Sequence, residues 1–453
     1  MKQAKSLFPM LFLLILVMLC SCGTNDVVEE KITLDDPIDF YESALARHGE
    51  QPRNELYTIA SKRLVSQQYT FKETTNQRIS IDPNSEIQVL QEIYYSDQPL
   101  STQFNFKEDT AYLQLNGNSF SQQMDYEAFC NAYFPTPLPD PNHYAEVVGT
   151  ETENGTVITF RQPVSQDAYS LSACDQLHDI TTSVVIDSDG FIVFLSQQAE
   201  YTLQDITVHA FYALSYAESN AAFTFSLLEN AIPVENLQYP LMAEKASGYL
   251  LQAENVLSAT FTKQLSSEVT NSDYSQTILL TRNASGTTIE TNVSLTDHSR
   301  GDSISNFRQT ESFGNGKYSI STNGEDAQAQ DNITEERFLS YFNNFLLESI
   351  LLPQHITGIE ATQTDGLIHL EFETSDDLAR ILAENTCKTL YQEPELLSTM
   401  LDSCTKDSVS VYLAVDPVIG IPCSAGIQFS GKHTLDNTSY AVTSDSNIAY
   451  SFN

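Results

Sequence analysis

The same order of sequence patterns occurs twice along this chain of 453 residues. In each half, a stretch with apolar residues at helical spacing precedes long segments in which apolar and polar residues alternate, as on strands with one buried face. A short helical stretch with aromatic residues follows, and each half ends in hairpin patterns and an alternating segment that carries tyrosine. The paired positions are the helical stretches 56–64 and 241–257, the aromatic residues Phe129 and Phe338, and the turns Asn154-Gly155 and Asp365-Gly366. The repeat predicts two tandem modules on one plan, and a chance parallel between two β-rich halves is the alternative.

Alternating strands with one apolar face need a covering layer, and the intervening helical stretches are the available cover. We therefore predict the α+β class, with two tandem duplicated modules that are each a curved antiparallel sheet covered by helices. The first module is expected over residues 50–235 and the second over 240–453, with a helical insertion near 376–404. This division also fits the length, which is too great for one hydrophobic core.

An apolar run over residues 7–19 follows Lys2 and Lys5 and ends just before Ser21 and Cys22. A charged start, a short apolar core and a small residue at the break are typical of a secretory signal peptide. The run falls short of the roughly 20 residues that a membrane-spanning helix needs. Residues 1–21 are therefore predicted to be a signal peptide, and residues 22–49 an acidic tether with a leading helix.

The segment Leu19-Cys20-Ser21-Cys22 resembles the lipobox of bacterial lipoproteins. Cys22 fits the modified position because the small Ser21 precedes it and Leu19 stands three residues before it, whereas the bulky Leu19 directly precedes Cys20. The resemblance implies a diacylglycerol on the Cys22 thiol, cleavage before that residue, and a fatty acid such as palmitate on the new amino terminus. It places the protein at the cell membrane, facing outside the cytoplasm, since two or more chains anchor stably. An ordinary signal peptide or an uncleaved anchor helix is the alternative.

The layout of each half, with a leading helix, long antiparallel strands, a helix and further hairpins, resembles the half-barrel of the lipoprotein-carrier superfamily. That superfamily includes LolA- and LppX-like proteins, in which a strongly curved sheet wraps helices and an apolar cavity between them takes lipid chains. The resemblance rests on element order, duplication and the anchor. It implies an apolar or lipid ligand, but no matching motif carries a binding residue over to this sequence.

The chain has 22 basic and 60 acidic residues, a formal charge of −38. Nucleic-acid binding needs a basic footprint, so nucleic acid is excluded as a partner. The acidic surface is expected to serve solubility. The histidines are scattered, and the chain has no nucleophile elbow, phosphate-binding loop or dinucleotide-binding loop. We therefore predict a protein that is not an enzyme, with no cofactor and no metal site.

Five cysteines remain once Cys20 leaves with the signal peptide and Cys22 is acylated: Cys130, Cys174, Cys387, Cys404 and Cys423. Outside the cytoplasm unpaired thiols tend to oxidise, so one or two disulfides are expected. In the first half the available pair is Cys130–Cys174, and at the insertion it is Cys387–Cys404. Both pairings are guesses, because spacing does not fix connectivity.

The segment Asp187-Ser188-Asp189-Gly190 resembles the opening of a calcium loop. Its glycine comes two residues early for such a loop, and apolar residues follow where further oxygen ligands are needed. We interpret the segment as a tight hairpin turn.

These patterns leave three functions open. The first is a lipid-anchored surface protein that binds an apolar ligand, and the second is an interaction or sensing protein whose modules have solid cores. The third is a hydrolase built from dispersed residues. A cavity of roughly 300 Å³ or more between sheet and helices would favour the first. Filling of that space by Phe338, Phe342 and Phe345 would favour the second.

Overall fold

The computed structural model describes residues 33–48 and 54–451, apart from gaps at 66–69, 95–98, 116, 154, 173, 204–205, 218–229, 252–257, 269–270, 284–285, 302, 326–327, 331–333, 335–337, 339–354, 379–380, 383–403, 418–419, 421 and 436–437. The labelled α-helices of this part are α2 (Pro37–Arg47), α3 (Tyr126–Tyr133) and α4 (Gln238–Leu251), and the short 3-10 helices are η2 (Pro141–His143), η3 (Gln166–Ala168) and η5 (His298–Arg300). Residues 376–378 and 381–382 are also helical. None of the described helices is long and apolar enough to cross a membrane.

Most of the described chain forms strands. The first sheet contains β1 (Glu55–Val65), β2 (Thr70–Ile81), β3 (Ile87–Tyr94), β4 (Leu100–Lys107), β5 (Thr110–Leu115), β6 (Asn118–Gln123), β7 (Tyr144–Thr152), β8 (Gly155–Pro163), β9 (Gln176–Ile186), β10 (Ile192–Leu203), β11 (Ile206–Ala217) and β12 (Ile232–Pro233). The second contains β13 (Ser258–Ser267), β14 (Ser272–Asn283), β15 (Gly286–Asp297), β16 (Ser303–Gly314), β17 (Lys317–Thr322), β18 (Gln328–Gln330), β19 (Ile356–Thr364), β20 (Leu367–Thr374), β21 (Cys404–Val415), β22 (Pro422–Leu435) and β23 (Thr438–Ser451).

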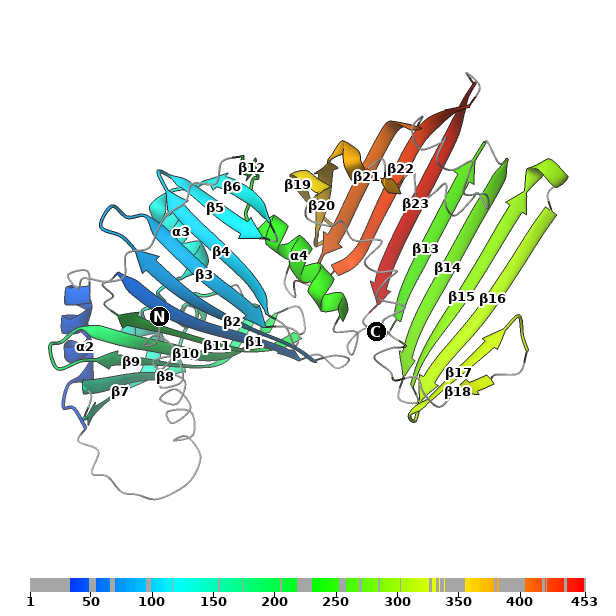
Figure 1. Cartoon of the computed structure of the whole chain (residues 1–453). Coiled ribbons are helices and arrows are strands. Elements are labelled where there is room, and N and C mark those ends of the chain that lie inside the picture. Colours follow the sequence, from blue (N-terminus) through cyan, green and yellow to red (C-terminus); the bar gives the residue numbers. More distant parts are fainter. Residues whose placement is uncertain are drawn as a thin grey trace.

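The two sheets have the same topology (Figure 1). The first runs in the order β12-β6-β5-β4-β3-β2-β1-β11-β10-β9-β8-β7, and the second runs β18-β17-β16-β15-β14-β13-β23-β22-β21-β20-β19. Replacing β1 through β11 by β13 through β23 turns one order into the other. The short β12 is the exception, since it joins the edge of the first sheet parallel to β6. In both sheets the first and last strands of the repeat pair antiparallel in the middle. Two modules on one plan are therefore present, as the repeat predicted.

The predicted α+β class, with sheets covered by helices, is wrong: the described chain is mostly β. The helices α2, α3 and α4 have 11, 8 and 14 residues, beside two large sheets of 12 and 11 strands. Residues 56–64, expected to be helical, lie in β1 between β2 and β11. Leu56, Ala60 and Leu64 are four apart, a spacing that puts them on one face of a helix and equally on one face of a strand. Because residues 56–64 pair with β2 on one side and with β11 on the other, they form a strand.

The structure describes two of the other expected helices and a small part of the third. The stretch 241–257 is helical as far as the end of α4, and α3 carries Phe129 and Tyr133 as predicted. Of the helical insertion predicted near 376–404, residues 376–378 and 381–382 are described and are helical, and residues 379–380 and 383–403 lie outside the described residues.

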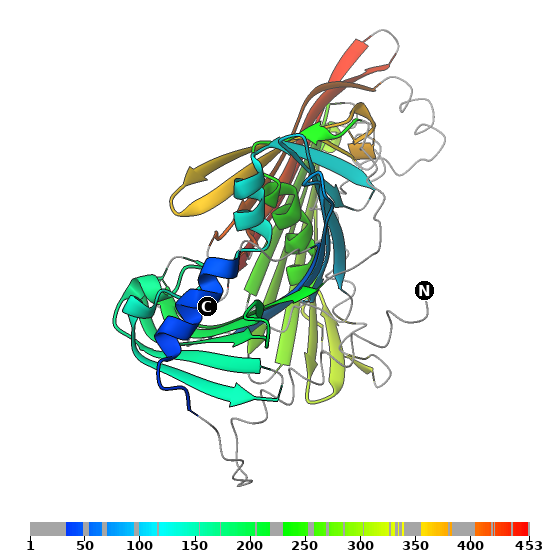
Figure 2. The same cartoon turned by 90° about the vertical axis from the view of Figure 1, so that its left-hand side faces the viewer.

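The first sheet curls around α2 and α3 (Figure 2), and we name the face on which these helices pack the inner face. Alternate side chains of neighbouring strands meet there in register and are buried: Leu56, Ile79, Val89, Phe104 and Leu113. Helix α3 packs on this face through Tyr133, whose ring lies 4.3 Å from that of Phe104, and α2 packs through Tyr41, 4.9 Å from Phe160. The core of the module therefore lies between the inner face and these two helices.

The predicted hairpin turns are confirmed. Gly155 joins β7 to β8 at a φ of +124°, where a Cβ would lie 2.2 Å from the Ile186 carbonyl oxygen, so only glycine fits. Asp365 and Gly366, with φ of +53° and +79°, make the equivalent turn between β19 and β20. In the turn at 187–190, Asp187 Oδ1 accepts hydrogen bonds from the backbone nitrogens of Asp189 and Phe191, which is the tight turn that we expected.

Candidate functional site

A cavity of about 290 Å³ lies on the inner face of the first sheet. Its lining comes from β1, β2, β10 and β11, from the end of α3, and from the segment after η3. Most of the lining is aromatic or aliphatic and includes Tyr133, Pro135, Tyr169, Leu171, Tyr201 and Tyr212. A mainly apolar lining with a few polar groups is typical of sites for small organic ligands, although this volume is at the lower end of their range.

Strand alternation places the central residues of the lining. Ala60 on β1 and Gln197 on β10 both pair with Tyr212 on β11, so the three side chains form one row on the inner face. In the adjacent row Lys62 pairs with Ala210. The two alanines are small residues among tyrosines, and they leave the volume that longer side chains would fill.

The tyrosines of the lining are held in place by hydrogen bonds and ring contacts. The buried Tyr212 hydroxyl donates to the Pro135 carbonyl oxygen at 2.7 Å. The rings of Tyr169 and Tyr201 lie 5.0 Å apart, and the Tyr201 hydroxyl is 3.0 Å from Ser172 Oγ. Burial raises the pKa of Tyr212 and of Tyr169 well above the ordinary value for tyrosine, so both stay neutral. The part of the wall that these tyrosines form is therefore uncharged.

The buried amide side chain of Gln197 belongs to the cavity lining. Gln197 is 2% exposed, and its Nε2 donates to Thr182 Oγ1 at 3.2 Å. Thr182 Oγ1 is 3.2 Å from the Tyr144 hydroxyl, which donates to the Ala168 carbonyl oxygen at 3.1 Å. Among the residues that the structure describes, Gln197 Oε1 has no hydrogen-bond partner. A buried acceptor of this kind normally has a partner, and this oxygen itself has almost no accessible surface.

A charged group lies at another side of the cavity. Lys62 and Glu73 belong to the lining, and Lys245 of α4 bonds Glu73 with an Nζ–Oε2 distance of 2.9 Å. Burial lowers the pKa of Lys62, while the carboxylates of Glu73 and of Asp416 in the second module act in the opposite direction. The charges of Glu73 and Asp416 thus offset those of Lys62 and Lys245. Helix α4 also contacts β19 and β21, so this side of the cavity adjoins the second module.

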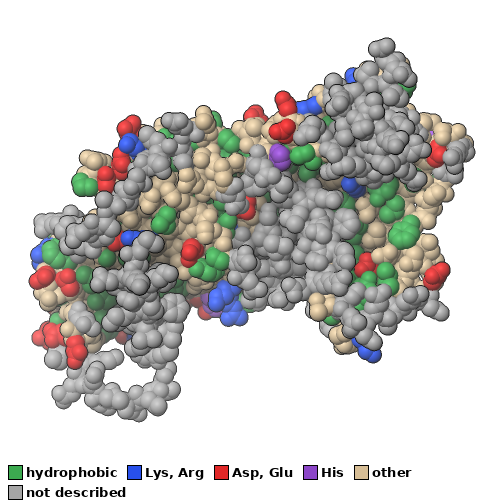
Figure 3. All heavy atoms as spheres, in the orientation of Figure 1, with side chains coloured by type: hydrophobic (Ala, Val, Ile, Leu, Met, Phe, Trp, Pro, Cys, Tyr) green, Lys and Arg blue, Asp and Glu red, His purple; other side chains and the backbone are tan. Residues whose placement is uncertain are grey.

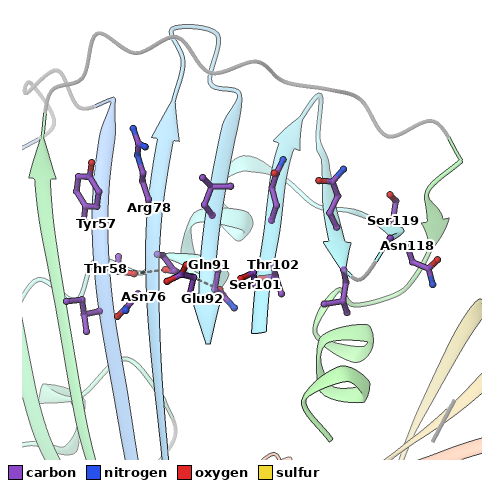
Figure 4. A pocket seen from close by; sticks show the side chains of 17 residues that line it. Tyr57, Thr58, Asn76, Arg78, Gln91, Glu92, Ser101, Thr102, Asn118 and Ser119 are labelled. Atoms are coloured by element: carbon purple, nitrogen blue, oxygen red, sulfur yellow. Dashed lines mark hydrogen bonds between the residues drawn. The ribbon is translucent and has the colours of Figure 1, made fainter. Parts of the chain in front are cut away.

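A larger hollow of about 670 Å³ lies on the opposite, outer face of the first sheet. Figure 4 shows Tyr57 and Arg78 next to each other there. The Tyr57 hydroxyl donates to Glu55 Oε1 at 2.7 Å, and burial together with this carboxylate raises the pKa of Tyr57 to about 12. The lining is otherwise mainly neutral and polar, and its Leu90 is 41% exposed. This hollow is larger, and most of its lining residues are polar, whereas most residues of the inner cavity are aromatic or aliphatic. We take the inner cavity as the candidate site.

The second module differs in its described interior. Phe338 is buried, and its ring lies 6.1 Å from that of Phe313 and 5.9 Å from that of Tyr318. Aromatic rings of the chain itself therefore fill this part of the interior, while Phe342 and Phe345 lie outside the described residues. A hollow of about 650 Å³ on this module is lined mainly by serine, threonine, glutamine and aspartate. In the view of Figure 3, the acidic side chains of the described surface are scattered rather than gathered in one patch.

The sequence predicted one lipidated cysteine and two disulfide pairs, and the structure describes only some of these residues. Cys22 and Cys387 lie outside the described residues, and the side chain of Cys404, the first residue of β21, is not described either. Cys130 and Cys174 are free thiols, so the expected Cys130–Cys174 disulfide is not formed in this structure. The Cys130 thiol instead interacts with the Tyr126 side chain on its own helix, and burial raises the pKa of Cys130 to about 11. Lipidation of Cys22 and the Cys387–Cys404 pair stay predictions.

Alkylation should distinguish free thiols from the disulfide. In the native protein at about pH 8 we expect Cys130 to react slowly with iodoacetamide, because the thiolate is the reactive form. After unfolding without a reductant, both Cys130 and Cys174 should take the label, as measured by peptide mass spectrometry. If both peptides stay unlabelled until a reductant is added, the two thiols are joined after all.

The sequence did not single out the polar residues of the cavity wall. Thr182 and Gln197 stand at inner-face positions of β9 and β10, where their neighbours along the strand are apolar residues such as Ile180 and Leu195. A polar residue at a buried position of an alternating strand needs a partner, and that was the available signal. The partners could not be identified, because Gln197 bonds Thr182 across 15 residues of sequence and Thr182 bonds Tyr144 across 38.

No family model and no curated protein matches this chain. Among solved structures it is similar to LprF from Mycobacterium bovis, with 12% identity over 42% of this chain and 95% of that one and a TM-score of 0.23. It is also similar to a LolA superfamily protein from Nitrosomonas europaea, with 7% identity over 41% of this chain and 92% of that one and a TM-score of 0.18. For MucB, solved in complex with MucA(peri), the identity is 8% over 90% and 91% of the two chains, with a TM-score of 0.17. Matches at these identities and TM-scores assign neither a family nor a ligand.

Proposed function

We propose that this protein is a membrane-anchored, extracytoplasmic lipoprotein whose first module binds a small apolar or amphipathic ligand without transforming it. The observation that carries the proposal is the inner-face cavity of about 290 Å³, with its tyrosine and aliphatic lining and its single buried amide. Apolar burial would supply most of the affinity, and the polar groups would orient the ligand.

The volume limits the kind of ligand. About 290 Å³ is close to the smallest volume at which sites for organic ligands occur. It suits one acyl chain or one small ring system, and a lipid with several chains would leave most of its surface outside. The proposal therefore concerns a single-chain or small ligand.

The chemistry of the lining favours binding over catalysis. The Tyr212 hydroxyl is committed to a backbone carbonyl oxygen, and burial keeps this phenol neutral. Lys62, the cation of the lining, is balanced by carboxylates. Such groups position a ligand, whereas a general base needs a pKa near the working pH and access to a substrate proton.

For the second module we propose a role in spacing or in contact with another protein. The packing of Phe338 on Phe313 and Tyr318 supports this role, because aromatic side chains fill this part of the interior. The two modules would then share a fold and differ in function.

The proposed anchor is tested by replacing Cys22. Cys22→Ala should move the protein from the membrane fraction to the soluble fraction, or leave the signal peptide uncut, because the lipid would lose its attachment site. Fractionation and the mass of the mature chain measure this. The matched control is Cys20→Ala, which should leave both unchanged. Unaltered membrane association and processing of Cys22→Ala would contradict the anchor.

Ligand binding can be measured with a fluorescent reporter. The chain has no tryptophan, so Leu171→Trp, at a partly buried position of the lining, gives a single tryptophan at the cavity. Titration of the full chain, held in an amphipathic polymer rather than detergent, with a medium-chain alcohol should change its emission saturably with one site per chain. The function would be refuted by unchanged emission with alcohols, fatty acids and small aromatic compounds alike.

A further inference from the structure

A row of side chains crosses the outer face of the first sheet at the hollow of about 670 Å³. Each member stands one position from an inner-face residue of its strand, so strand alternation turns it outward. Register brings the members together on neighbouring strands: Tyr57, Arg78, Leu90, Gln103, Gln114 and Ser119. Figure 4 shows Tyr57, Arg78 and Ser119 in this row. From β1 to β6 the row spans about 24 Å, since neighbouring strands lie about 4.8 Å apart.

One end of the row is built on a buried carboxylate. Glu55 is 5% exposed, and its Oε1 accepts hydrogen bonds from the Tyr57 hydroxyl and from Arg78 Nε. Both partners are wall groups of the hollow, and they offset the cost of burying the charge. The Arg78 side chain is still 42% exposed, and its guanidinium has further N–H donors beyond Nε. Glu55 thus holds an aromatic ring and a planar cation next to each other, with both accessible from the hollow.

The rest of the hollow offers amides and hydroxyls. Gln103, Gln114 and Asn76 carry amide groups, and Ser101 and Ser119 carry hydroxyl groups. These side chains are exposed or half-buried, so a ligand can reach them. An amide both donates and accepts hydrogen bonds, and so does a hydroxyl group. The lining therefore matches a ligand that carries many hydroxyl groups.

The charges at the hollow favour an uncharged ligand. Arg78 is paired with Glu55, and the lining adds the exposed carboxylate of Glu92. An anionic ligand would meet both carboxylates, in a chain of formal charge −38. A cationic ligand would meet Arg78.

The position of the hollow disfavours a peptide. A peptide that extends a sheet binds at an edge strand, where backbone groups are free. Strands β1 to β5 each pair with a neighbour on both sides, and β6 pairs with β5 and β12. An amphipathic helix would need a row of apolar anchors, and most of this lining is polar. Recognition here must use polar side chains.

We propose that this hollow is a second binding site, which takes a neutral oligosaccharide lying across β1 to β6. The C–H face of a sugar ring would pack on Tyr57 and Leu90, because these side chains give the row its accessible apolar surface. The sugar hydroxyl groups would pair with Arg78 and with the amides of Gln103 and Gln114. The site lies on the opposite face of the sheet from the inner cavity, so the inference does not depend on the ligand of that cavity.

Calorimetry with the full chain tests the proposal, with maltohexaose, cellohexaose and chitohexaose as neutral probes. We expect at least one of them to bind saturably. Tyr57→Ala and Gln114→Leu should each weaken that binding about tenfold, because the first loses a ring contact and the second loses an amide. Both positions are partly accessible, and thermal unfolding checks that the variants fold.

Two further variants are controls. Gln198→Leu changes an exposed glutamine on the outer face of β10, outside the hollow, and should leave the sugar affinity unchanged. Ala210→Phe alters the inner cavity on the other face and should also leave it unchanged.

The other results would overturn the inference. Absence of binding by all three sugars would do so and leave the inner-cavity function standing. Undiminished binding by folded Tyr57→Ala and Gln114→Leu proteins would place the sugar elsewhere. Tighter binding of hexagalacturonate than of every neutral sugar would favour an anionic ligand at Arg78. Binding of an uncharged glycine-serine peptide, but of no sugar, would favour a peptide.

Discussion

Replacing Phe160 by alanine should lower the free energy of unfolding of the first module by about 3–5 kcal/mol. Phe160 on β8 is fully buried on the inner face, and its ring lies 4.9 Å from that of Tyr41 on α2 and 5.4 Å from that of Tyr144. The Tyr41 hydroxyl donates to the Pro139 carbonyl oxygen, which restricts how far α2 can move to fill the gap. The variant would therefore lose apolar burial and keep a cavity.

Denaturant unfolding measures this effect, with the transition of the first module analysed separately because the chain has two modules. The control is Val164→Ala, whose parent side chain is 63% exposed, and we expect a change within about 0.5 kcal/mol for it. A loss below about 1 kcal/mol for Phe160→Ala would mean that α2 does not form part of the core as described.

Ala210→Phe should abolish ligand binding, with a loss of at least about a hundredfold in affinity. Ala210 lies in the inner-face row next to that of Gln197, and its methyl group borders the cavity. A phenylalanine ring there would occupy a large part of the roughly 290 Å³ that the ligand needs. The Leu171→Trp emission measured during a decanol titration reports the loss.

Two checks keep this result interpretable. Ala145→Phe adds the same ring at an exposed position of β7 and should leave the affinity unchanged. The unfolding midpoint of Ala210→Phe should stay near that of the parent, because the ring fills existing space. Undiminished decanol binding by a folded Ala210→Phe protein would exclude the inner cavity as the site.

Local patterns predicted much of this fold. The turn at Asp365-Gly366 and the helix that carries Phe129 follow from residue types within a few positions of each other, and the structure has both. The repeat predicted two equivalent modules, and the identical strand orders agree. These features depend on short-range preferences and on the comparison of one half with the other.

Features that depend on distant partners were not predictable in the same way. The spacing of Leu56, Ala60 and Leu64 suits a helix and a strand equally, and the choice is made by pairing with β11, about 150 residues later in register. The candidate site also depends on strand pairing, because this pairing places Gln197 beside Thr182 and Tyr212. The hydrogen bonds that join Gln197, Thr182 and Tyr144 also form only in the folded protein.

Native mass spectrometry of the full chain, purified from its membrane in an amphipathic polymer, tests most directly whether the first module holds a ligand. We predict a population with one added small mass per chain, lost after solvent extraction, restored by decanol and missing from Ala210→Phe. A bare chain that takes up neither decanol nor a fatty acid, or an added mass that Ala210→Phe retains, would contradict ligand binding in the inner cavity.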